Sequence, residues 1–277
     1  MNRTSVYRSA ESRDHFRTRY QAFLDTMPFT QRRIDTPFGE TFLLEAGGDD
    51  RPAVLLLHGS CSNSAFWFSD ILALMGEYHV FAVDIPGEAG NSSEYRLGLE
   101  TGEYALWLGS VLDALGLPAV SIAGNSLGGW MALKFATAFP ARVEKLMLFA
   151  SGGLANANER LLEQAAAADH SGSVDVLDSG AADGAVLPPE ILEFLNLILE
   201  SYAPIAVPLP LFSAGQLARL TMPVLYVAGT DDNLLDSLSG EAALRQSVPH
   251  AKTHLLPGVG HVIMNPSFWM LPFLRDA

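Results

Sequence analysis

The sequence contains a single cysteine, Cys61, and no long apolar run. One cysteine cannot form a disulfide within the chain, which is typical of proteins in a reducing compartment. No stretch approaches the roughly 20 apolar residues that a membrane-spanning helix needs. The first residues also lack the apolar core of a secretory signal. We therefore expect a cytoplasmic protein.

Basic residues are also few. The chain has 17 Lys and Arg against 31 Asp and Glu, which gives a formal net charge of −14. Nucleic-acid surfaces and proteins that bind anionic membranes need clustered Lys and Arg, so we expect neither partner. Hydrophobic residues make up 49% of the 277 positions and charged residues 17%. This is enough for one α/β domain with an insertion, or for two small domains.

Residues 119–129, which read A-V-S-I-A-G-N-S-L-G-G, change from a strand pattern to a helix pattern within a few positions. The first five are small or β-branched, as in a short buried parallel strand, and good helix formers follow. Gly124 and Gly128 allow backbone segments to approach too closely for a Cβ. Ser126 is therefore expected at the tip of a sharp turn, with the Leu127 amide at the helix N-terminus beside it. The alternative is a serine in an ordinary turn, but the strand before it and the helix after it favour the G-x-S-x-G elbow of a nucleophilic serine.

Strands and helices alternate through most of the chain, which indicates a parallel, doubly wound α/β sheet. An antiparallel hairpin is predicted around Gly39-Glu40 at a sheet edge. Predicted strands cover residues 34–38, 41–44, 53–57, 79–83, 119–123, 143–149, 223–228 and 253–256. Predicted helices cover residues 9–27, 65–75, 104–115, 188–202 and 237–246, with a last one after Pro266.

The alternation stops between residues 153 and 222, which we interpret as a helical cap inserted into one core formed by residues 1–152 and 223–277. Within the insertion we expect a helix over 155–168 and a Gly/Asp/Ser-rich loop over 171–185. The apolar residues of the insertion are expected partly to pack on the sheet and partly to roof a pocket. They are Ile191, Leu192, Phe194, Leu195, Leu197, Ile198, Leu199, Ile205, Val207, Leu209, Leu211 and Phe212.

An acid and a histidine follow later strands of the predicted sheet. Asp231 and Asp232 come after one strand and His261 after the next. The carboxyl ends of parallel strands meet at one edge, where α/β sheets build their sites. A serine hydroxyl becomes a good nucleophile when a base takes its proton, and the base needs an acid to fix its tautomer. We expect His261 to act as the base of Ser126 and Asp232 to orient it, with Asp231 as the alternative acid.

With these residues the sequence resembles the α/β-hydrolase superfamily over nearly its whole length, and in particular bacterial carboxylesterase-like members with an N-terminal helix and a short helical cap. The matching motifs are H-G-S at 58–60, D-I-P-G-E-A-G-N-S at 84–92, G-N-S-L-G-G at 124–129, G-T-D-D at 229–232 and G-V-G-H at 258–261. The resemblance implies an eight-stranded, mostly parallel sheet whose second strand is antiparallel. It also implies an oxyanion hole formed by the backbone N–H groups of Ser60 and Leu127. Relatives commonly place the acid three residues after the strand-ending glycine, which favours Asp232.

One loop departs from the family pattern, since D-I-P-G-E-A-G-N-S has an extra residue between its glycines compared with D-x-x-G-x-G-x-S. Other polar residues near the motifs have simpler interpretations. We expect His58 to brace the oxyanion loop, Cys61 to be a buried thiol and Asp84 to fix its own loop. Asn125 either contacts substrate or supports the turn. The aromatic residues beside the motifs could line the pocket, but such residues usually belong to the core; they are Phe66, Trp67, Phe68 and Trp130.

The sequence therefore predicts a serine hydrolase that cleaves a small, largely uncharged ester through an acyl-enzyme, without a cofactor or a metal. Three other reactions use the same residues: C–C bond hydrolysis, thioester hydrolysis and acyl transfer. A ligand receptor on the same scaffold is a further alternative, because one fold hosts many functions.

Overall fold

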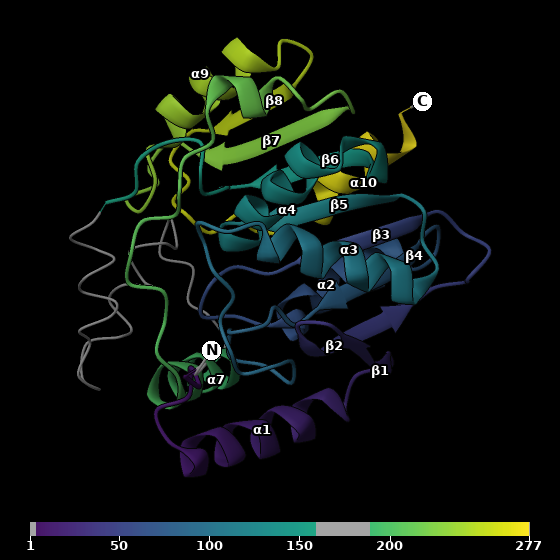
Figure 1. Ribbon diagram of the computed structural model, residues 1–277, viewed down its shortest axis with the longest axis vertical. Helices are drawn as coiled ribbons and strands as arrows, with labels where there is room; N and C mark the ends of the chain where they lie inside the picture. Colours follow the sequence, from purple (N-terminus) through teal and green to yellow (C-terminus); the bar gives the residue numbers. More distant parts are fainter. Residues whose placement is uncertain (1–3, 159–188, 277) are drawn as a thin grey trace.

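The computed structural model describes residues 4–158 and 189–276 (Figure 1). Eight strands form one sheet in the order β1-β2-β4-β3-β5-β6-β7-β8. The strands are β1 (Thr30–Thr36), β2 (Gly39–Ala46), β3 (Ala53–Leu57), β4 (His79–Val83), β5 (Val120–Asn125), β6 (Val143–Phe149), β7 (Val224–Gly229) and β8 (Lys252–Leu256). The predicted mostly parallel, eight-stranded α/β sheet is confirmed.

The antiparallel part of the sheet lies at one edge. β1 pairs with β2, and β2 pairs with β4, both antiparallel, whereas every later pair is parallel. The hairpin turn is shifted by two residues from its predicted place. Thr36 pairs with Gly39, so Pro37 and Phe38 form the turn and Gly39 already belongs to β2.

Helices cover both faces of the sheet, and Figure 1 shows α3 and α4 in front of it. Buried side chains of α3, α4, α8 and α9 form the core on one face, and those of α1, α2, α7 and α10 form the core on the other. In the described parts of the chain the α-helices are α1 (Ala10–Leu24), α2 (Phe68–Leu74), α3 (Glu103–Leu115), α4 (Leu127–Ala138), α7 (Pro189–Ser201), α8 (Ala214–Leu217), α9 (Ser237–Ser247) and α10 (Ser267–Arg275). The short 3-10 helices are η1 (Ser64–Trp67) and η2 (Pro140–Arg142).

The continuous apolar run of β3 follows from its place between these two cores. Leu55 and Leu57 pack into the core that contains α3 and α4, whereas Val54 and Leu56 pack into the opposite core. All four side chains are inaccessible to solvent. Burial of each contributes on the order of 2 kcal/mol relative to an exposed side chain. A strand buried on both faces therefore needs apolar residues at every position.

The N-terminal helix packs against the loop that follows β4. Ser9 caps α1 through a reciprocal pair of hydrogen bonds with Ser12. The buried residues of α1, Phe16, Tyr20 and Leu24, recur at every fourth position and so share one face of the helix. The helix predicted over 9–27 is present as Ala10–Leu24.

Between β6 and β7 the structure describes residues 150–158, α7, α8 and the irregular segment that joins these two helices. The helix predicted over 155–168 lies outside the described residues except for its first positions, and the predicted loop over 171–185 lies wholly outside them. The division into a core and a cap stays a prediction.

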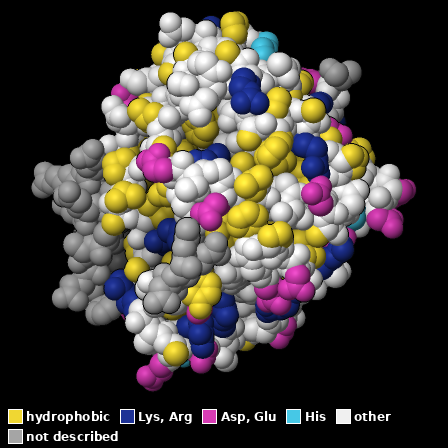
Figure 2. Space-filling model, viewed as in Figure 1, with side chains coloured by type: hydrophobic (Ala, Val, Ile, Leu, Met, Phe, Trp, Pro, Cys, Tyr) yellow, Lys and Arg dark blue, Asp and Glu magenta, His cyan; other side chains and the backbone are white. Residues whose placement is uncertain are grey.

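The surface of the molecule carries charges of both signs. On the face shown in Figure 2, Lys and Arg side chains are mixed with Asp and Glu side chains, and hydrophobic side chains lie between them. Within the described ranges, no helix has both the length and the apolar character needed to cross a membrane.

Candidate active site

Ser126 occupies the sharp turn between β5 and α4. Its φ of 51° and ψ of −109° lie in a region that residues with a Cβ rarely adopt, at a cost of roughly 1–3 kcal/mol. The two glycines of the motif are required by close backbone contacts. A Cβ on Gly124 would lie 2.4 Å from the Gly128 carbonyl oxygen, and one on Gly128 would lie 2.1 Å from the Leu57 carbonyl oxygen. The turn therefore packs against the end of β3 and fixes the Ser126 side chain.

Ser126, His261 and Asp232 form a continuous chain of hydrogen bonds. The Nε2 atom of His261 lies 3.0 Å from Ser126 Oγ, and its Nδ1 atom lies 2.8 Å from Asp232 Oδ2. Because an ionised Asp232 can only accept, Nδ1 carries the proton and Nε2 is free to accept the Ser126 hydroxyl proton. The structure thus brings together the three residues that the sequence singled out from separate loops.

The Asp232 carboxylate is fully buried and has several donors. Its Oδ1 atom accepts hydrogen bonds from the backbone amides of Leu234 and Leu235, both at 2.9 Å, and Oδ2 also accepts from Ser237 Oγ at 3.1 Å. Burial acts to raise the pKa of Asp232, but the bonds from His261 and the two amides outweigh it and hold that pKa below its ordinary value. The carboxylate is therefore ionised at neutral pH.

Asp231 faces away from this chain of hydrogen bonds. It is exposed, and its Oδ1 atom accepts a hydrogen bond from Thr230 Oγ1 at 2.7 Å. Its neighbour Asp232 is the one that contacts His261.

The two predicted oxyanion-hole residues border the same pocket as Ser126. Ser60 and Leu127 both line it, and Gly59 lies against Ser126, since a Cβ on Gly59 would be 3.5 Å from Ser126 Cβ. Among the described residues, neither the Ser60 amide nor the Leu127 amide has a hydrogen-bond acceptor. The Leu127 amide has no partner within α4 because it is in the first turn of that helix.

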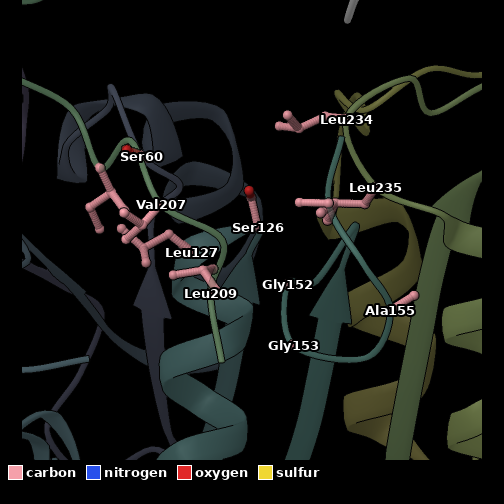
Figure 3. A pocket seen from close by; sticks show the side chains of 12 residues that line it. Ser60, Ser126, Leu127, Gly152, Gly153, Ala155, Val207, Leu209, Leu234 and Leu235 are labelled. Carbon is pink, nitrogen blue, oxygen red and sulfur yellow. The ribbon is translucent and has the colours of Figure 1, made fainter. Parts of the chain in front are cut away.

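The pocket around Ser126 is apolar. Figure 3 shows Ser126 between two groups of side chains, with Val207 and Leu209 on one side and Leu234 and Leu235 on the other. Its described lining is Ser60, Ser126, Leu127, Gly152, Gly153, Ala155, Ala157, Ile205, Val207, Leu209, Leu234 and Leu235, none of which is charged.

The apolar residues of the insertion were expected partly to pack on the sheet and partly to roof a pocket, and the described residues include both kinds. Ile205, Val207 and Leu209 line the pocket, and Ile198 of α7 is buried in the core that also holds α1. Leu234 and Leu235 were not expected in the lining. Neither Trp67 nor Trp130 borders the pocket, and both are buried in the core.

Two polar residues connect the loop after β3 to the loop after β4. The Nδ1 atom of His58 lies 2.7 Å from the Gly59 carbonyl oxygen, and Nε2 accepts a hydrogen bond from the Ile85 amide at 2.9 Å. Burial lowers the pKa of His58, which favours the neutral ring that these two bonds require. The buried Asp84 carboxylate accepts hydrogen bonds from the Ser64 and Asn91 amides. Both residues thus brace the site, in the manner expected of them.

Sequence reasoning missed two polar residues beside the predicted oxyanion hole. The buried Glu88 carboxylate contacts Ser60 and Cys61, and the hydroxyl of Tyr202, at the end of α7, joins them. The extra residue in the loop at 84–92 is the sequence feature that could have pointed to Glu88. Nothing in the sequence pattern pairs it with Tyr202. Asn125 is half-buried and does not line the pocket.

The curated relatives to which the chain is similar include two that match it over part of its length. It is 34% identical over 145 residues to the carboxylesterase YbfK of Bacillus subtilis, which covers 51% of this chain and 49% of that protein. It is 37% identical over 110 residues to a 2-hydroxy-6-oxononadienedioate/2-hydroxy-6-oxononatrienedioate hydrolase of Burkholderia vietnamiensis, covering 38% of each. The matched segments thus span about half or less of these relatives.

Solved structures match almost the whole chain. The crystal structure of the carboxylesterase CesB (YbfK) from Bacillus subtilis superimposes with a TM-score of 0.84 at 24% identity, covering 96% of this chain and 98% of that one. The naproxen esterase (carboxylesterase NP) of the same organism gives 0.85 at 24% identity, with the same coverage. These likenesses show the fold. The model of the alpha/beta hydrolase family matches residues 54–268, which is well over half of the sequence, and the chain belongs to that family.

Proposed function

We propose that this protein is a serine carboxylesterase in which Ser126 is the nucleophile. The observation that carries the proposal is the hydrogen-bonded chain from Ser126 through His261 to Asp232, at the wall of an apolar pocket. In that chain His261 is the base and Asp232 holds its tautomer and stabilises its cation.

The proposed reaction follows from this geometry. Ser126 Oγ attacks the ester carbonyl carbon while its proton passes to His261 Nε2, and the carbonyl π electrons move to the oxygen. The tetrahedral intermediate collapses, the alcohol leaves with the proton from His261, and an acyl-enzyme remains. Water then attacks in the same manner, His261 takes a proton from it, and the acid is released as Ser126 regains its proton.

The unpaired amides of Ser60 and Leu127 are proposed to bind the oxygen that becomes negative. Backbone donors already in place need no reorganisation, and one such donor is worth roughly 10²–10³-fold in kcat. Two observations support this assignment: both residues line the pocket with Ser126, and neither amide has an acceptor within the described parts of the chain.

The lining favours a small, uncharged ester. Apolar side chains stabilise an apolar acyl or alcohol group, and no Lys or Arg from the described residues reaches the pocket to pair with a carboxylate. The similarity to carboxylesterases supports an ester as the substrate. The hydrolase of Burkholderia vietnamiensis to which the chain is similar is named for dioate substrates, and two carboxylates would be left unpaired in such a pocket.

The test combines active-site labelling with a panel of esters. A fluorophosphonate should label Ser126, and Ser126→Ala should lower kcat by roughly 10⁴-fold or more while leaving the circular dichroism spectrum unchanged. Neutral p-nitrophenyl esters should be cleaved faster than hemisuccinate esters of similar size. Labelling at another serine would contradict the nucleophile. Preference for anionic acyl groups would contradict the substrate class. Tight ligand binding by the wild type without turnover would favour the receptor alternative.

A further inference from the structure

Glu88 is a buried carboxylate that the proposed reaction does not use. Its exposed fraction is 3%, and it occupies the part of the loop after β4 that holds one residue more than the family pattern. The preceding Gly87 has a φ of +79°, and a Cβ there would lie 2.5 Å from the Cα of Arg96. The backbone thus turns tightly at Gly87, and the next side chain enters the interior.

One oxygen of Glu88 gathers donors from two distant segments. Oε2 accepts hydrogen bonds from the Tyr202 hydroxyl at 2.6 Å, the Cys61 amide at 3.1 Å and the Ser60 hydroxyl at 3.2 Å. The other oxygen, Oε1, is buried and has no hydrogen-bond partner among the described residues, and Arg96 Nη2 lies 3.7 Å from it. Burial raises the pKa of Glu88 despite these favourable contacts. Burial of a carboxylate here costs free energy of folding, so a contribution to stability alone does not explain the presence of Glu88.

The residue that Glu88 holds has an unusual backbone. Cys61 has a φ of +56°, in the left-handed region that residues with a Cβ disfavour by roughly 1–2 kcal/mol. Such a conformation persists when its surroundings over-determine it. Here the Cys61 amide donates to both Glu88 Oε2 and the Tyr202 hydroxyl, each at 3.1 Å. These two acceptors fix the peptide unit between Ser60 and Cys61.

The same group holds the side chain of Ser60. Its hydroxyl lies 3.2 Å from Glu88 Oε2 and 3.2 Å from the Tyr202 hydroxyl. Ser60 is therefore held at its side chain and at the amide that follows it. Its own amide has no acceptor among the described residues, and Ser60 lines the pocket. This amide is therefore available to donate a hydrogen bond.

We propose that Glu88, acting with Tyr202, is a positioning residue for the oxyanion hole: it holds the turn at Ser60 and Cys61 so that the Ser60 amide is directed at the developing oxyanion. This inference rests on the proposed function, because it assigns a role within the same site. It differs from a purely structural role, in which Glu88 would only anchor the end of α7 through Tyr202.

The experiment compares Glu88→Leu with Glu88→Gln. Leucine fills a similar volume and accepts no hydrogen bond, whereas the glutamine amide oxygen can still accept from the Cys61 amide. Glu94→Gln is the matched control. Glu94 follows the same loop and pairs with Arg13 rather than with the turn. Each variant is assayed for kcat and KM on a neutral ester and for its affinity for a trifluoromethyl ketone. The ketone reacts with Ser126 to give an anionic hemiketal, whose oxygen needs the same donors as the intermediate.

In Glu88→Leu we expect kcat to fall roughly 10- to 100-fold with KM little changed, which is less than the loss of a whole donor. Affinity for the ketone should fall by the same factor. Glu88→Gln should recover most of both, and Glu94→Gln should match the wild type. If Glu88→Leu does not fold, Tyr202→Phe takes its place, because it removes one of the two acceptors of the Cys61 amide and should lower kcat and ketone affinity together.

Two results would overturn the proposal. In one, Glu88→Leu or Tyr202→Phe loses thermal stability but keeps the wild-type kcat and ketone affinity, which identifies a structural anchor. In the other, kcat falls while ketone affinity is unchanged, which places the effect outside the oxyanion hole. Failure of the proposed esterase function is distinguished beforehand, since it would show in the wild type as absent turnover and absent labelling of Ser126.

Discussion

Asp231 and Asp232 are adjacent in sequence but have different environments. Asp232 is buried and hydrogen-bonded to His261, whereas Asp231 is exposed and bonds to Thr230. A triad acid holds the tautomer of its histidine, and its loss costs about 10⁴-fold in the best-studied case. We therefore expect Asp232→Asn to lower kcat by several orders of magnitude and Asp231→Asn to change it little. Steady-state kinetics on folded variants provides the test, and the reverse ranking would make Asp231 the acid.

The low pKa of Asp232 also predicts how stability varies with pH. The unfolded chain takes up this proton near pH 3.9, the ordinary value for aspartate, whereas the folded protein takes it up at lower pH. The stabilisation is complete above the unfolded pKa and is lost as pH falls through the folded pKa. The difference in Tm between the wild type and Asp232→Asn should therefore be largest near neutral pH and shrink below about pH 4. Calorimetry across that range measures it, and a difference that grows in acid would be inconsistent with the depressed pKa.

At the scale of elements, α10 receives its N-terminal cap from another helix. Its own N-cap residue, Pro266, supplies no side-chain hydrogen bond. Instead Asp70 of α2 accepts a hydrogen bond from the Ser267 amide at 2.7 Å. At the other end, Lys145 of β6 donates to the Leu274 carbonyl oxygen at 2.9 Å. Two tertiary contacts thus take the place of local capping signals in the sequence.

Asp70→Ala should accordingly destabilise the protein by about 0.5–2 kcal/mol, the usual cost of losing a helix cap. Asp70→Asn keeps an acceptor oxygen and should lose less. Urea denaturation followed by tryptophan fluorescence gives both free energies of unfolding. Equal losses in the two variants would argue against capping by Asp70.

Sequence patterns predicted the elements whose causes are local. The elbow at Ser126 was predictable because its strand, glycines and helix all lie within one short stretch. The segment at 65–75 was less so, because it divides into η1 and α2, and the Ser64 amide at its start is held by Asp84 of another loop. The contact between Glu88 and Tyr202 joins residues 114 positions apart. No local pattern encodes such a contact.

At the scale of the whole molecule, the N-terminal segment packs against the loop after β4 and is hydrogen-bonded to it. The Tyr7 hydroxyl donates to the Gly90 carbonyl oxygen at 2.8 Å, Arg17 donates to the Ser92 carbonyl oxygen at 2.8 Å, and Tyr20 donates to Asp84 at 3.0 Å. Burial raises the pKa of Tyr7 to about 12, so its hydroxyl keeps its proton and remains a donor at neutral pH. The N-terminal helix is therefore an integral part of the support of the site.

The proposed nucleophile and base follow strands of very different exposure. β5, which ends one residue before Ser126, lies between β3 and β6 and is almost wholly buried. β8, which precedes His261, pairs with β7 alone among the described strands, and none of its residues is fully buried. Edge segments with few buried contacts open at lower free energy than the core. In hydrogen-exchange mass spectrometry, amides of β8 should therefore exchange well before those of β5. As urea is raised, esterase turnover should be lost reversibly while the amides of the central strands remain protected from exchange. The reason is that His261, which follows β8, moves away while Ser126 is still held at the end of β5.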